Sequence, residues 1–356
     1  MNYNTIRRKT RAVKVGSVLI GGDAPISVQS MTNTRTSDYE ATKERIEALA
    51  RGGCDIVRLA VPDRESVQTI ARLKEAGVPV PLVADIHFDY RLAIECAAAG
   101  ADKIRINPGN IGGEDRVKAV VTACRNAGIP IRIGVNSGSL EKELLAKYGS
   151  PTPEALAESA LGHVRLLEKY DFADILIAVK SSDPLTMITA NRILAASCDY
   201  PLHLGVTEAG VSGIGTLKSA VGIGSLLCDG IGDTIRVSLT DSPLEEGKAG
   251  RNILRALGIG NAITVVSCPT CGRTKIHLIE LAKEMEARLG EIRREGPYTI
   301  AVMGCAVNGP GEAREADIGI AGGDGEALLF RHGEIVGKLP EEGLITRLIE
   351  EINRGA

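Results

Sequence analysis

The chain has 356 residues, which is enough for two or three domains and for a substantial hydrophobic core. Its 42 Lys and Arg residues are balanced by 45 Asp and Glu residues, and the formal net charge of −3 argues against wholesale binding to nucleic acid or to a membrane surface. Trp is absent and aromatic residues make up 3% of the chain, which leaves few side chains on which nucleic-acid bases could stack.

The first residues, MNYNTIRRKTRAVKVG, include basic side chains but no apolar run behind them, so no signal peptide is expected. No stretch approaches the roughly 18 apolar residues that a membrane span requires. The chain has 8 cysteines without an export signal, which indicates a reducing compartment. We therefore expect a cytoplasmic protein in which a CxxC motif serves metal or redox chemistry.

From the amino terminus the chain repeats one unit: a short run rich in Val and Ile, a polar or glycine-containing turn, and an amphipathic helical pattern such as YEATKERIEALARGG. The candidate strands are residues 26–31, 55–61, 81–87, 103–107, 131–136, 175–180, 202–208 and 234–239. Strands that alternate with helices pair in parallel, and eight of them in about 250 residues predict a TIM-type (β/α)8 barrel. We place this α/β TIM barrel, as the substrate-binding domain, in residues 1–258, with a doubly wound open sheet as the alternative.

Polar side chains interrupt these strands at or near their carboxyl ends, although a buried parallel strand should be apolar nearly throughout. They are Arg58, Asp85, His87, Arg105, Asn107, Arg132, Asn136, Lys180, His203, Thr207, Glu208, Arg236 and Ser238. In a barrel the carboxyl ends of the strands meet at one mouth, where barrel enzymes keep their chemistry. Any single one of these side chains could begin a solvated loop or fill a polar layer of the core. Cations on five different strands, however, are poorly explained by coincidence.

The cations Arg58, Arg105, Arg132, Lys180 and Arg236 would repel one another at one mouth unless an anion joined them. The guanidinium fork suits phosphate oxygens, so we predict a polyanionic ligand such as a diphosphate. Asp85, His87 and Glu208 could then move protons or hold hydroxyl groups. The run GVSGIGTLKSAVGIGS carries Lys218 where a dinucleotide motif needs its third glycine, so NAD is not expected.

The pattern changes near ALGIGNA, which predicts a separate α+β domain in residues 259–356. We expect a strand at 263–267, the CxxC turn, a helix at about 274–294 and a strand at 298–304. Two or three short strands and a closing helix in PEEGLITRLIEEINR should follow. The candidate ligands of a metal site all belong to this domain.

Cys268 and Cys271 form the CxxC pair, and Cys305 follows the second strand, whereas an all-cysteine zinc or iron–sulfur site needs four thiolates. The chain could carry a thioredoxin-like dithiol, a structural zinc completed by His277 or His332, inert buried thiols, or an iron–sulfur cluster. The composition of the segment CAVNGPGE predicts a tight turn able to bring Glu312 back towards Cys305. This carboxylate is either an ordinary surface residue or a fourth ligand. An iron held by oxygen would be easier to open to substrate and would act as a Lewis acid as well as an electron donor.

The motifs CPTCGRT, MGCAVNGPGE, LHLGVTEAG, ADIHFDYRLA and IRINPGNIG together resemble the 4-hydroxy-3-methylbut-2-enyl diphosphate synthases of the non-mevalonate isoprenoid pathway, over essentially the whole chain. The chain is similar to their two-domain bacterial form, because no large insertion separates the two predicted domains. The resemblance implies a TIM barrel followed by a [4Fe–4S] domain, in a head-to-tail homodimer whose cluster domain caps the barrel mouth of the partner. It implies the two-electron reductive ring opening and dehydration of 2-C-methyl-D-erythritol 2,4-cyclodiphosphate, with electrons from flavodoxin or ferredoxin.

The resemblance also implies a role for each candidate site residue. The cluster ligands would be Cys268, Cys271, Cys305 and Glu312. The diphosphate would be held by Arg58, Arg105, Arg132, Lys180, Arg236 and Ser238. The pocket would be completed by Asp85, His87, Asn107, Asn136, Thr207 and Glu208, with Glu208 near the substrate hydroxyl that is lost as water. The rival reading is a non-redox sugar-phosphate barrel enzyme with a structural zinc domain. A protein that only carries electrons would not explain the cations at the strand ends.

Overall fold

The computed structural model describes residues 3–260, 263–294, 296–306, 311 and 313–354. The chain separates into two compact units, Met1–Ile253 and Leu254–Ala356. The expected division after residue 258 stays a prediction, because compactness alone does not define an independently folding domain. Within the described residues, every helix is too short or too polar to cross a membrane.

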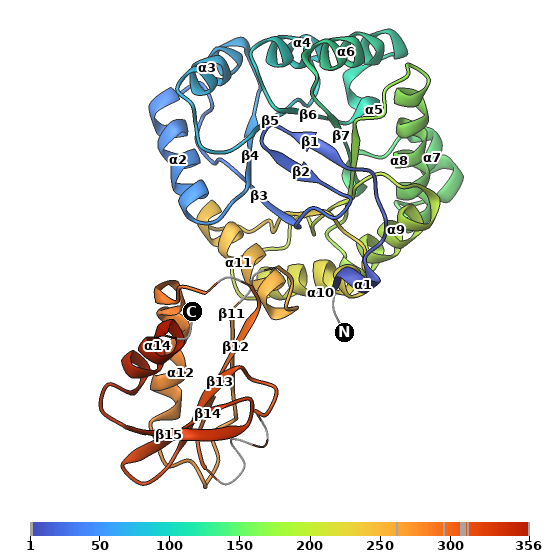
Figure 1. Ribbon diagram of the computed structural model, residues 1–356. Helices are drawn as coiled ribbons and strands as arrows, with labels where there is room; N and C mark the ends of the chain where they lie inside the picture. The colour runs from blue at the N-terminus through green and yellow to red at the C-terminus, as the bar shows by residue number, and fades with distance from the viewer. Residues whose placement is uncertain (1–2, 261–262, 295, 307–310, 312, 355–356) are drawn as a thin grey trace. The chain divides into compact units, whose positions relative to one another are not determined.

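The first unit is a (β/α)8 barrel, as predicted (Figure 1). Its parallel strands are hydrogen-bonded in the order β8-β7-β6-β5-β4-β3-β10-β9, and an isolated parallel bridge between Ile177 and Leu202 joins the two ends of this sheet. An open doubly wound sheet would lack this closure. The strands are β3 (Ser27–Met31), β4 (Ile56–Ala60), β5 (Leu82–Asp85), β6 (Lys103–Ile106), β7 (Ile131–Asn136), β8 (Ile175–Lys180), β9 (His203–Leu204) and β10 (Thr234–Ile235).

The last two barrel strands are shorter than the sequence predicted, because β9 and β10 have two residues each. Gly205 follows β9, and a Cβ atom there would lie 2.8 Å from Nζ of Lys180 and 2.5 Å from the carbonyl oxygen of Arg236. Isolated backbone hydrogen bonds, such as the one from Arg236 N to Leu204 O (2.9 Å), continue the contact beyond the strands. The ladder is therefore interrupted where the barrel accommodates long cationic side chains.

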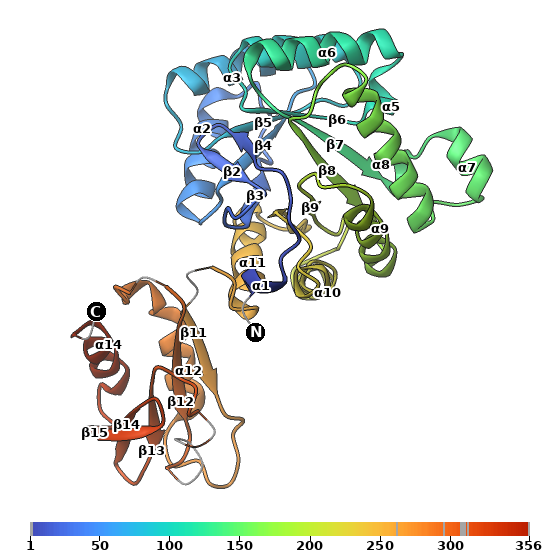
Figure 2. The same cartoon turned by 45° about the vertical axis from the view of Figure 1, so that its right-hand side comes forward.

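Helices cover the outside of the ring of strands (Figures 1 and 2). The longer ones are α2 (Tyr39–Arg51), α3 (Arg64–Glu75), α4 (Tyr90–Ala98), α6 (Glu114–Ala127), α8 (Pro153–Glu168), α9 (Pro184–Ser197), α10 (Ile214–Cys228) and α11 (Pro243–Ala256). Shorter ones are α1 (Tyr3–Ile6), α5 (Pro108–Ile111), η1 (Ser137–Ser139) and α7 (Lys142–Tyr148). Several helices begin directly after a strand at an Asp side chain, such as Asp63, whose carboxylate accepts a hydrogen bond from Ser66 N at 2.8 Å. Such N-caps fix the point where each loop at the barrel mouth ends.

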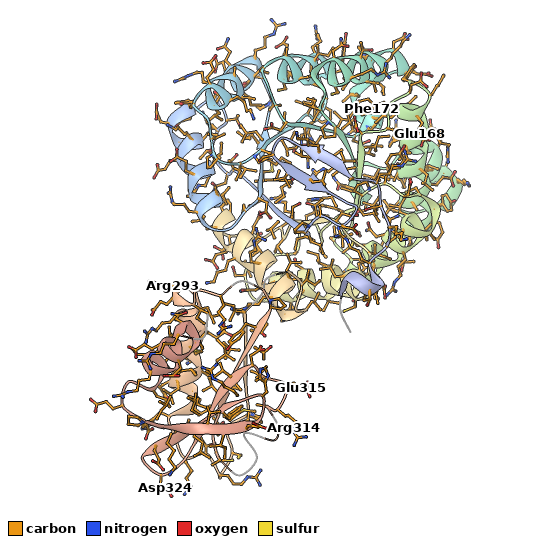
Figure 3. All side chains as sticks on the ribbon, viewed as in Figure 1. Glu168, Phe172, Arg293, Arg314, Glu315 and Asp324 are labelled. Atoms are coloured by element: carbon orange, nitrogen blue, oxygen red, sulfur yellow. The ribbon has the colours of Figure 1, made fainter. Side chains whose placement is uncertain are left out.

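An amino-terminal hairpin covers the amino ends of the barrel strands, and the repeat pattern did not predict it. It consists of β1 (Val13–Val15) and β2 (Val18–Ile20), paired antiparallel, and lies across the middle of the ring in Figure 1. The buried cluster that joins hairpin and barrel comprises Val13, Val15, Ile20, Ile56, Val83 and Leu176. Above this apolar base, side chains fill the interior of the ring (Figure 3). The barrel is therefore apolar at one end and polar towards the mouth.

The second unit is the smaller α+β domain that the sequence predicted. Its mixed sheet has the order β11-β12-β13-β14-β15, parallel as far as β13 and antiparallel beyond it. The strands are β11 (Ile263–Ser267), β12 (Tyr298–Met303), β13 (Ile318–Gly322), β14 (Glu326–Arg331) and β15 (Glu334–Pro340). The helices α12 (Leu278–Ala287) and α14 (Leu344–Arg354) share one buried apolar cluster with the sheet.

The predicted helix at 274–294 is wrong at both ends. Thr274 closes a turn with the CxxC motif, since its N–H donates to Cys271 O at 3.0 Å and its hydroxyl accepts from Cys271 N at 3.2 Å. The helix therefore begins at Leu278, and a short 3-10 turn, η2 (Leu289–Glu291), follows its end.

Candidate functional site

The five predicted cations lie in one barrel, on neighbouring strands or directly after them. Asp85, Arg105 and Arg132 are partners across the adjacent strands β5, β6 and β7. Residues paired across a sheet share a face, so these three side chains point to the same side, into the barrel. Arg132 is 1% exposed, and Arg105 and Lys180 are also buried. The charges are thus held away from bulk water, where electrostatic interactions are strong.

Asp85 is the anionic centre of this group. Its carboxylate is 3.0 Å from Nη1 of Arg105, 3.7 Å from Nε of Arg58 and 3.4 Å from Nε2 of His87. Burial alone would raise the pKa of Asp85, but the Arg58 charge, the hydrogen bond from His87 and the Arg105 charge outweigh it and hold that pKa well below its ordinary value. Asp85 therefore stays ionised, which favours orienting the two guanidinium groups over transferring protons.

Arg236 has a carboxylate partner that sequence reasoning missed. Glu246, in the first turn of α11, accepts from Nε of Arg236 at 3.2 Å and from its Nη2 at 3.2 Å. Glu246 is 4% exposed. It lies on a helix, so the search for polar residues at strand ends could not find it. The sequence signal that was available is a pair of glutamates, Glu245 and Glu246, in the first turn of the last barrel helix, which opens with a Pro.

The other cations are not neutralised. Nε and Nη1 of Arg132 have no hydrogen-bond partner among the described residues. Burial, followed by the charges of Arg58 and Arg105, lowers the pKa of Arg132 well below its ordinary value. Burial, followed by the charges of Arg236 and Arg58, does the same to the pKa of Lys180. An arginine keeps its proton in spite of this, so its charge stays buried without compensation. Binding of an anion beside it would therefore be favourable.

A further polar layer lies one step deeper in the barrel. Lys103 precedes Arg105 by two residues in β6 and so shares its face. Nζ of Lys103, Nε2 of His203 and both amide atoms of Gln29 have no hydrogen-bond partner within the described part of the chain. Burial, followed by Arg132, lowers the pKa of both Lys103 and His203. Lys103 was missed because it lies at the start of its strand and not at the carboxyl end. Its position two residues before Arg105 was the signal in the sequence that could have found it.

A glycine makes room for one of the guanidinium groups. Gly134 stands two residues after Arg132 in β7, and a Cβ atom there would overlap the guanidinium of Arg105. Any other side chain at this position would push Arg105 out of line with Asp85. The sequence thus preserves the space that the ion pair occupies.

The remaining predicted residues follow the strands at the rim of the mouth. Asn107 caps α5: its side chain accepts from Gly109 N at 3.1 Å and donates to Ser139 Oγ at 3.2 Å. Asn136 ends β7 opposite Lys180 of β8. Thr207 and Ser238 are half-buried beyond β9 and β10. Glu208 is exposed with a φ of 52°, a left-handed conformation that costs energy in a residue other than glycine.

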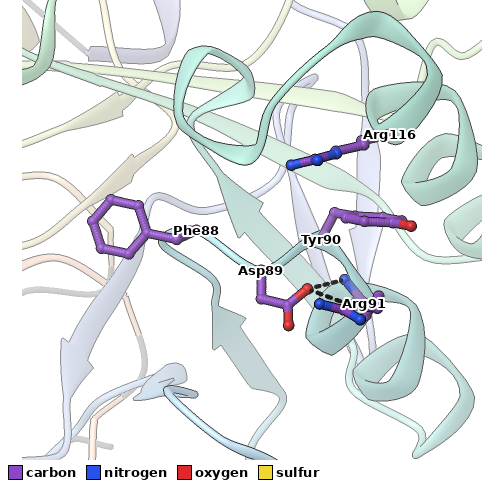
Figure 4. Close-up of a pocket in the computed structure, with 5 residues that line it drawn as sticks. All are labelled: Phe88, Asp89, Tyr90, Arg91 and Arg116. Carbon is purple, nitrogen blue, oxygen red and sulfur yellow. Dashed lines mark hydrogen bonds and ion pairs between the residues drawn. The ribbon is translucent and has the colours of Figure 1, made fainter.

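A pocket is lined by residues of the loop that follows β5, of the start of α4 and of α6 (Figure 4). Phe88 is largely exposed at one side of it, and the guanidinium of Arg116 lies over the Tyr90 ring, 5.6 Å from its centre. Asp89 accepts from both N and Nε of Arg91 at 3.0 and 3.1 Å. None of the predicted site residues is among the five that line it.

The cysteines of the second unit gather at the carboxyl ends of two neighbouring parallel strands. Cys268 follows β11 and Cys305 follows β12, and Gly304 N donates to Sγ of Cys268 at 3.2 Å. A backbone hydrogen bond from Arg273 lowers the pKa of the exposed Cys271 thiol. Glu312, the predicted fourth ligand, lies outside the described residues. Among the described side chains, no three of His, Cys, Asp or Glu converge on one point as the ligands of a single zinc ion would.

These residues fit an iron–sulfur cluster in their donor type. Iron–sulfur clusters are held by cysteine thiolates, and backbone N–H groups commonly bond to their sulfurs. A lowered pKa favours the thiolate that binds metal. In a four-iron cluster each cysteine binds a different iron, so its ligands need not converge on one point.

Comparisons with known proteins agree for both units. The GcpE TIM-barrel domain family matches residues 10–251, and the GcpE protein C-terminal domain family matches residues 264–354. A 4-hydroxy-3-methylbut-2-en-1-yl diphosphate synthase (flavodoxin) of Clostridium perfringens is 58% identical over 97% of this chain and 99% of that protein. The synthase of the same name from Geobacter sulfurreducens is 56% identical over 98% of each chain.

Solved structures support the fold alone. A crystal structure of type I 3-dehydroquinate dehydratase from Clostridium difficile matches with a TM-score of 0.51 and 16% identity, covering 70% of this chain and 98% of that one. Such low identity shows a shared architecture and says nothing of chemistry. The domain matches and the high identity over nearly the full length carry the assignment. The chain is an enzyme that belongs to the GcpE family, the family of the 4-hydroxy-3-methylbut-2-en-1-yl diphosphate synthases.

Proposed function

We propose that this chain catalyses the reductive ring opening and dehydration of 2-C-methyl-D-erythritol 2,4-cyclodiphosphate. Two electrons and two protons convert this cyclic diphosphate to 4-hydroxy-3-methylbut-2-enyl diphosphate and one water. The names of the relatives support this product and flavodoxin as the electron donor. Ferredoxin is the alternative donor. The observation that carries the proposal is the excess of buried cations over carboxylates inside the barrel.

The barrel would bind the diphosphate through these cations. Arg132 and Lys180 have charges that no described carboxylate neutralises, and phosphate oxygens would accept their hydrogen bonds and relieve the repulsion. Arg58 and Arg105, oriented by Asp85, would add two guanidinium groups. Arg236 and Ser238 would complete the set from the end of β10.

The rim would hold the rest of the substrate. His87, Asn107, Asn136 and Thr207 offer hydrogen-bonding side chains at the carboxyl ends of their strands. Glu208 presents an exposed carboxylate on the loop after β9. Placed beside the hydroxyl that leaves as water, it would hold or deliver the proton that this departure requires.

The second unit would hold a [4Fe–4S] cluster through Cys268, Cys271 and Cys305, with Glu312 as the fourth ligand. Bound there, the cluster would supply the electrons and, at its carboxylate-held iron, a Lewis acid. All eight cysteines lie within the described residues and are free, which supports a reducing, cytoplasmic location.

A head-to-tail homodimer would bring the two halves of the chemistry together, since cations and cysteines belong to different compact units of the chain. In this arrangement the cluster of one subunit serves the barrel of the other. Mixing inactive Arg132→Met and Cys271→Ser chains tests it, because a mixed dimer then has one intact site. Exchange of subunits should restore about one quarter of wild-type activity. Continued inactivity of an exchanged mixture would show that each chain serves itself.

The proposed chemistry is tested first by iron and acid-labile sulfide content and visible spectrum, in anaerobically purified protein. About four irons and four sulfides per chain are expected for wild type. Both should fall in Cys271→Ser and Glu312→Ala but not in Cys228→Ser, which changes another exposed cysteine. Turnover of the cyclic diphosphate with reduced flavodoxin then tests the reaction. A colourless protein with stoichiometric zinc would favour the non-redox rival.

A further inference from the structure

We propose that Glu246 is a positioning residue for anion binding: it holds Arg236, and the backbone beside Ser238, in the arrangement that receives the diphosphate. The inference rests on the proposed function, because it assumes that the anion binds at Arg236. Glu246 reaches the site from α11 and is one of the carboxylates that the strand-end pattern did not reveal.

Glu246 ties three parts of the barrel together. Besides the two bonds to Arg236, it accepts a hydrogen bond from Ser30 Oγ of β3 at 2.9 Å. It also accepts from the backbone N–H of Leu239 at 3.1 Å. Leu239 directly follows Ser238, so this bond fixes the backbone that carries the predicted diphosphate ligand.

The donor count of Arg236 leaves it able to bind a second anion. A guanidinium has five N–H donors, of which Glu246 engages one on Nε and one on Nη2. Three donors stay available to other acceptors. The carboxylate, by contrast, already accepts four hydrogen bonds, which matches the capacity of its two oxygens. Glu246 is therefore saturated and acts through Arg236 rather than on the substrate.

Charge and geometry predict opposite results for removal of this carboxylate. If Glu246 only offset the charge of Arg236, its neutralisation would make the site more positive and anion binding tighter. If it positions Arg236 and the segment beside Ser238, its neutralisation would release both and weaken binding. A residue with a purely structural role would change stability and leave binding by the folded protein unaltered.

Calorimetric titration of the full-length protein with inorganic pyrophosphate separates these outcomes. Glu246→Gln keeps the size of the side chain and an acceptor oxygen, and we expect the Kd for pyrophosphate to rise about tenfold, since a charge-assisted hydrogen bond is worth at least one such factor. Glu245→Gln is the matched control, because Glu245 is the neighbouring residue on α11 and its side chain is 50% exposed. This control should bind as wild type does.

A double-mutant cycle shows whether Glu246 acts through Arg236. In an Arg236→Met background, Glu246→Gln should weaken pyrophosphate binding by clearly less than the tenfold expected in the wild-type background, because only the segment beside Ser238 is then left to position. With the cyclic diphosphate, Glu246→Gln should raise KM more than it lowers kcat. If Glu246→Gln does not fold, Glu246→Asp replaces it, and retention of the charge on a shorter side chain should give a smaller loss.

Tighter or unchanged pyrophosphate binding by folded Glu246→Gln would overturn the inference while leaving the proposed function intact. Full additivity with Arg236→Met would overturn it too. Absence of pyrophosphate binding by the wild type would instead count against the proposed anion site itself, so the two failures are distinguishable.

Discussion

Replacement of Arg132 by Met should make the protein more stable and less able to bind its anion. Arg132 is 1% exposed, and two of its nitrogens have no hydrogen-bond partner among the described residues. The positive charges of Arg58 and Arg105 destabilise the charged form of Arg132, whereas the negative charge of Asp85 stabilises it. Methionine is long and flexible enough to fill much of the same space without a charge.

The size of the effect follows from the groups removed. Each buried donor left unpaired costs about 1–3 kcal/mol. Replacing buried charges by apolar side chains of similar volume stabilises proteins by about 1–4 kcal/mol. We expect Arg132→Met to raise the free energy of unfolding of the barrel within that range, or the melting temperature by about 2–10 °C. Its affinity for pyrophosphate should fall at least about tenfold, because charge-assisted hydrogen bonds are lost.

Thermal unfolding with and without pyrophosphate measures both effects together. The variant should melt above wild type in buffer, and this lead should shrink by at least about 1.4 kcal/mol at saturating pyrophosphate, because a tenfold lower affinity gives that much less stabilisation by the ligand. Arg51→Met is the control, since Arg51 is 71% exposed and its loss should change stability by less than about 0.5 kcal/mol. A variant destabilised by more than about 1 kcal/mol that binds pyrophosphate normally would refute the reasoning.

Three other predictions concern stability, acid and thiols. Ile20→Ala in the hairpin should lower the free energy of unfolding by about 2–5 kcal/mol in denaturant titrations, because Ile20 is fully buried. Burial alone would raise the pKa of Glu141, but hydrogen bonds from His163 and a serine of α8 lower it to about 2. This carboxylate stabilises the fold above its unfolded pKa and loses that effect as the pH falls towards 2, so unfolding of Glu141→Gln should depend less on pH between about 2 and 4.5. Burial raises the pKa of Cys96 to about 12, so in labelling followed by peptide mass spectrometry at pH 8 Cys96 should react far more slowly than the exposed Cys228. Equal labelling rates in the folded protein, or an unchanged acid profile, would contradict these expectations.

The barrel was predictable because its signals are local. Each strand is a short Val- and Ile-rich run, each helix has its own apolar spacing, and the polar residues that break the strands stand at their ends. Arg58, Arg105 and Arg132 could be assigned to one mouth because the carboxyl ends of all the parallel strands of a barrel meet there.

Features that depend on distant parts of the chain could not be predicted in this way. Glu246 reaches the site from a helix, so its partnership with Arg236 exists only once α11 packs against the barrel. The hairpin strands have three residues each, too few for a periodic pattern. The late start of α12 depends on a hydroxyl of Thr274 that bonds the CxxC turn instead of beginning a helix. Glu312 lies outside the described residues, so its role as a ligand stays a prediction.

The amino-terminal hairpin determines by which end of the barrel a ligand can enter and leave. Val13, Val15 and Ile20 seal the amino ends of the strands with apolar contacts, so a charged ligand has its route through the opposite end. Substrate, product and the water released would then all pass through the barrel mouth. If a partner subunit covered that mouth, substrate could not enter and product could not leave. Each turnover would then have to include an opening of the mouth, and the lifetime of the closed state would set an upper limit on the turnover rate.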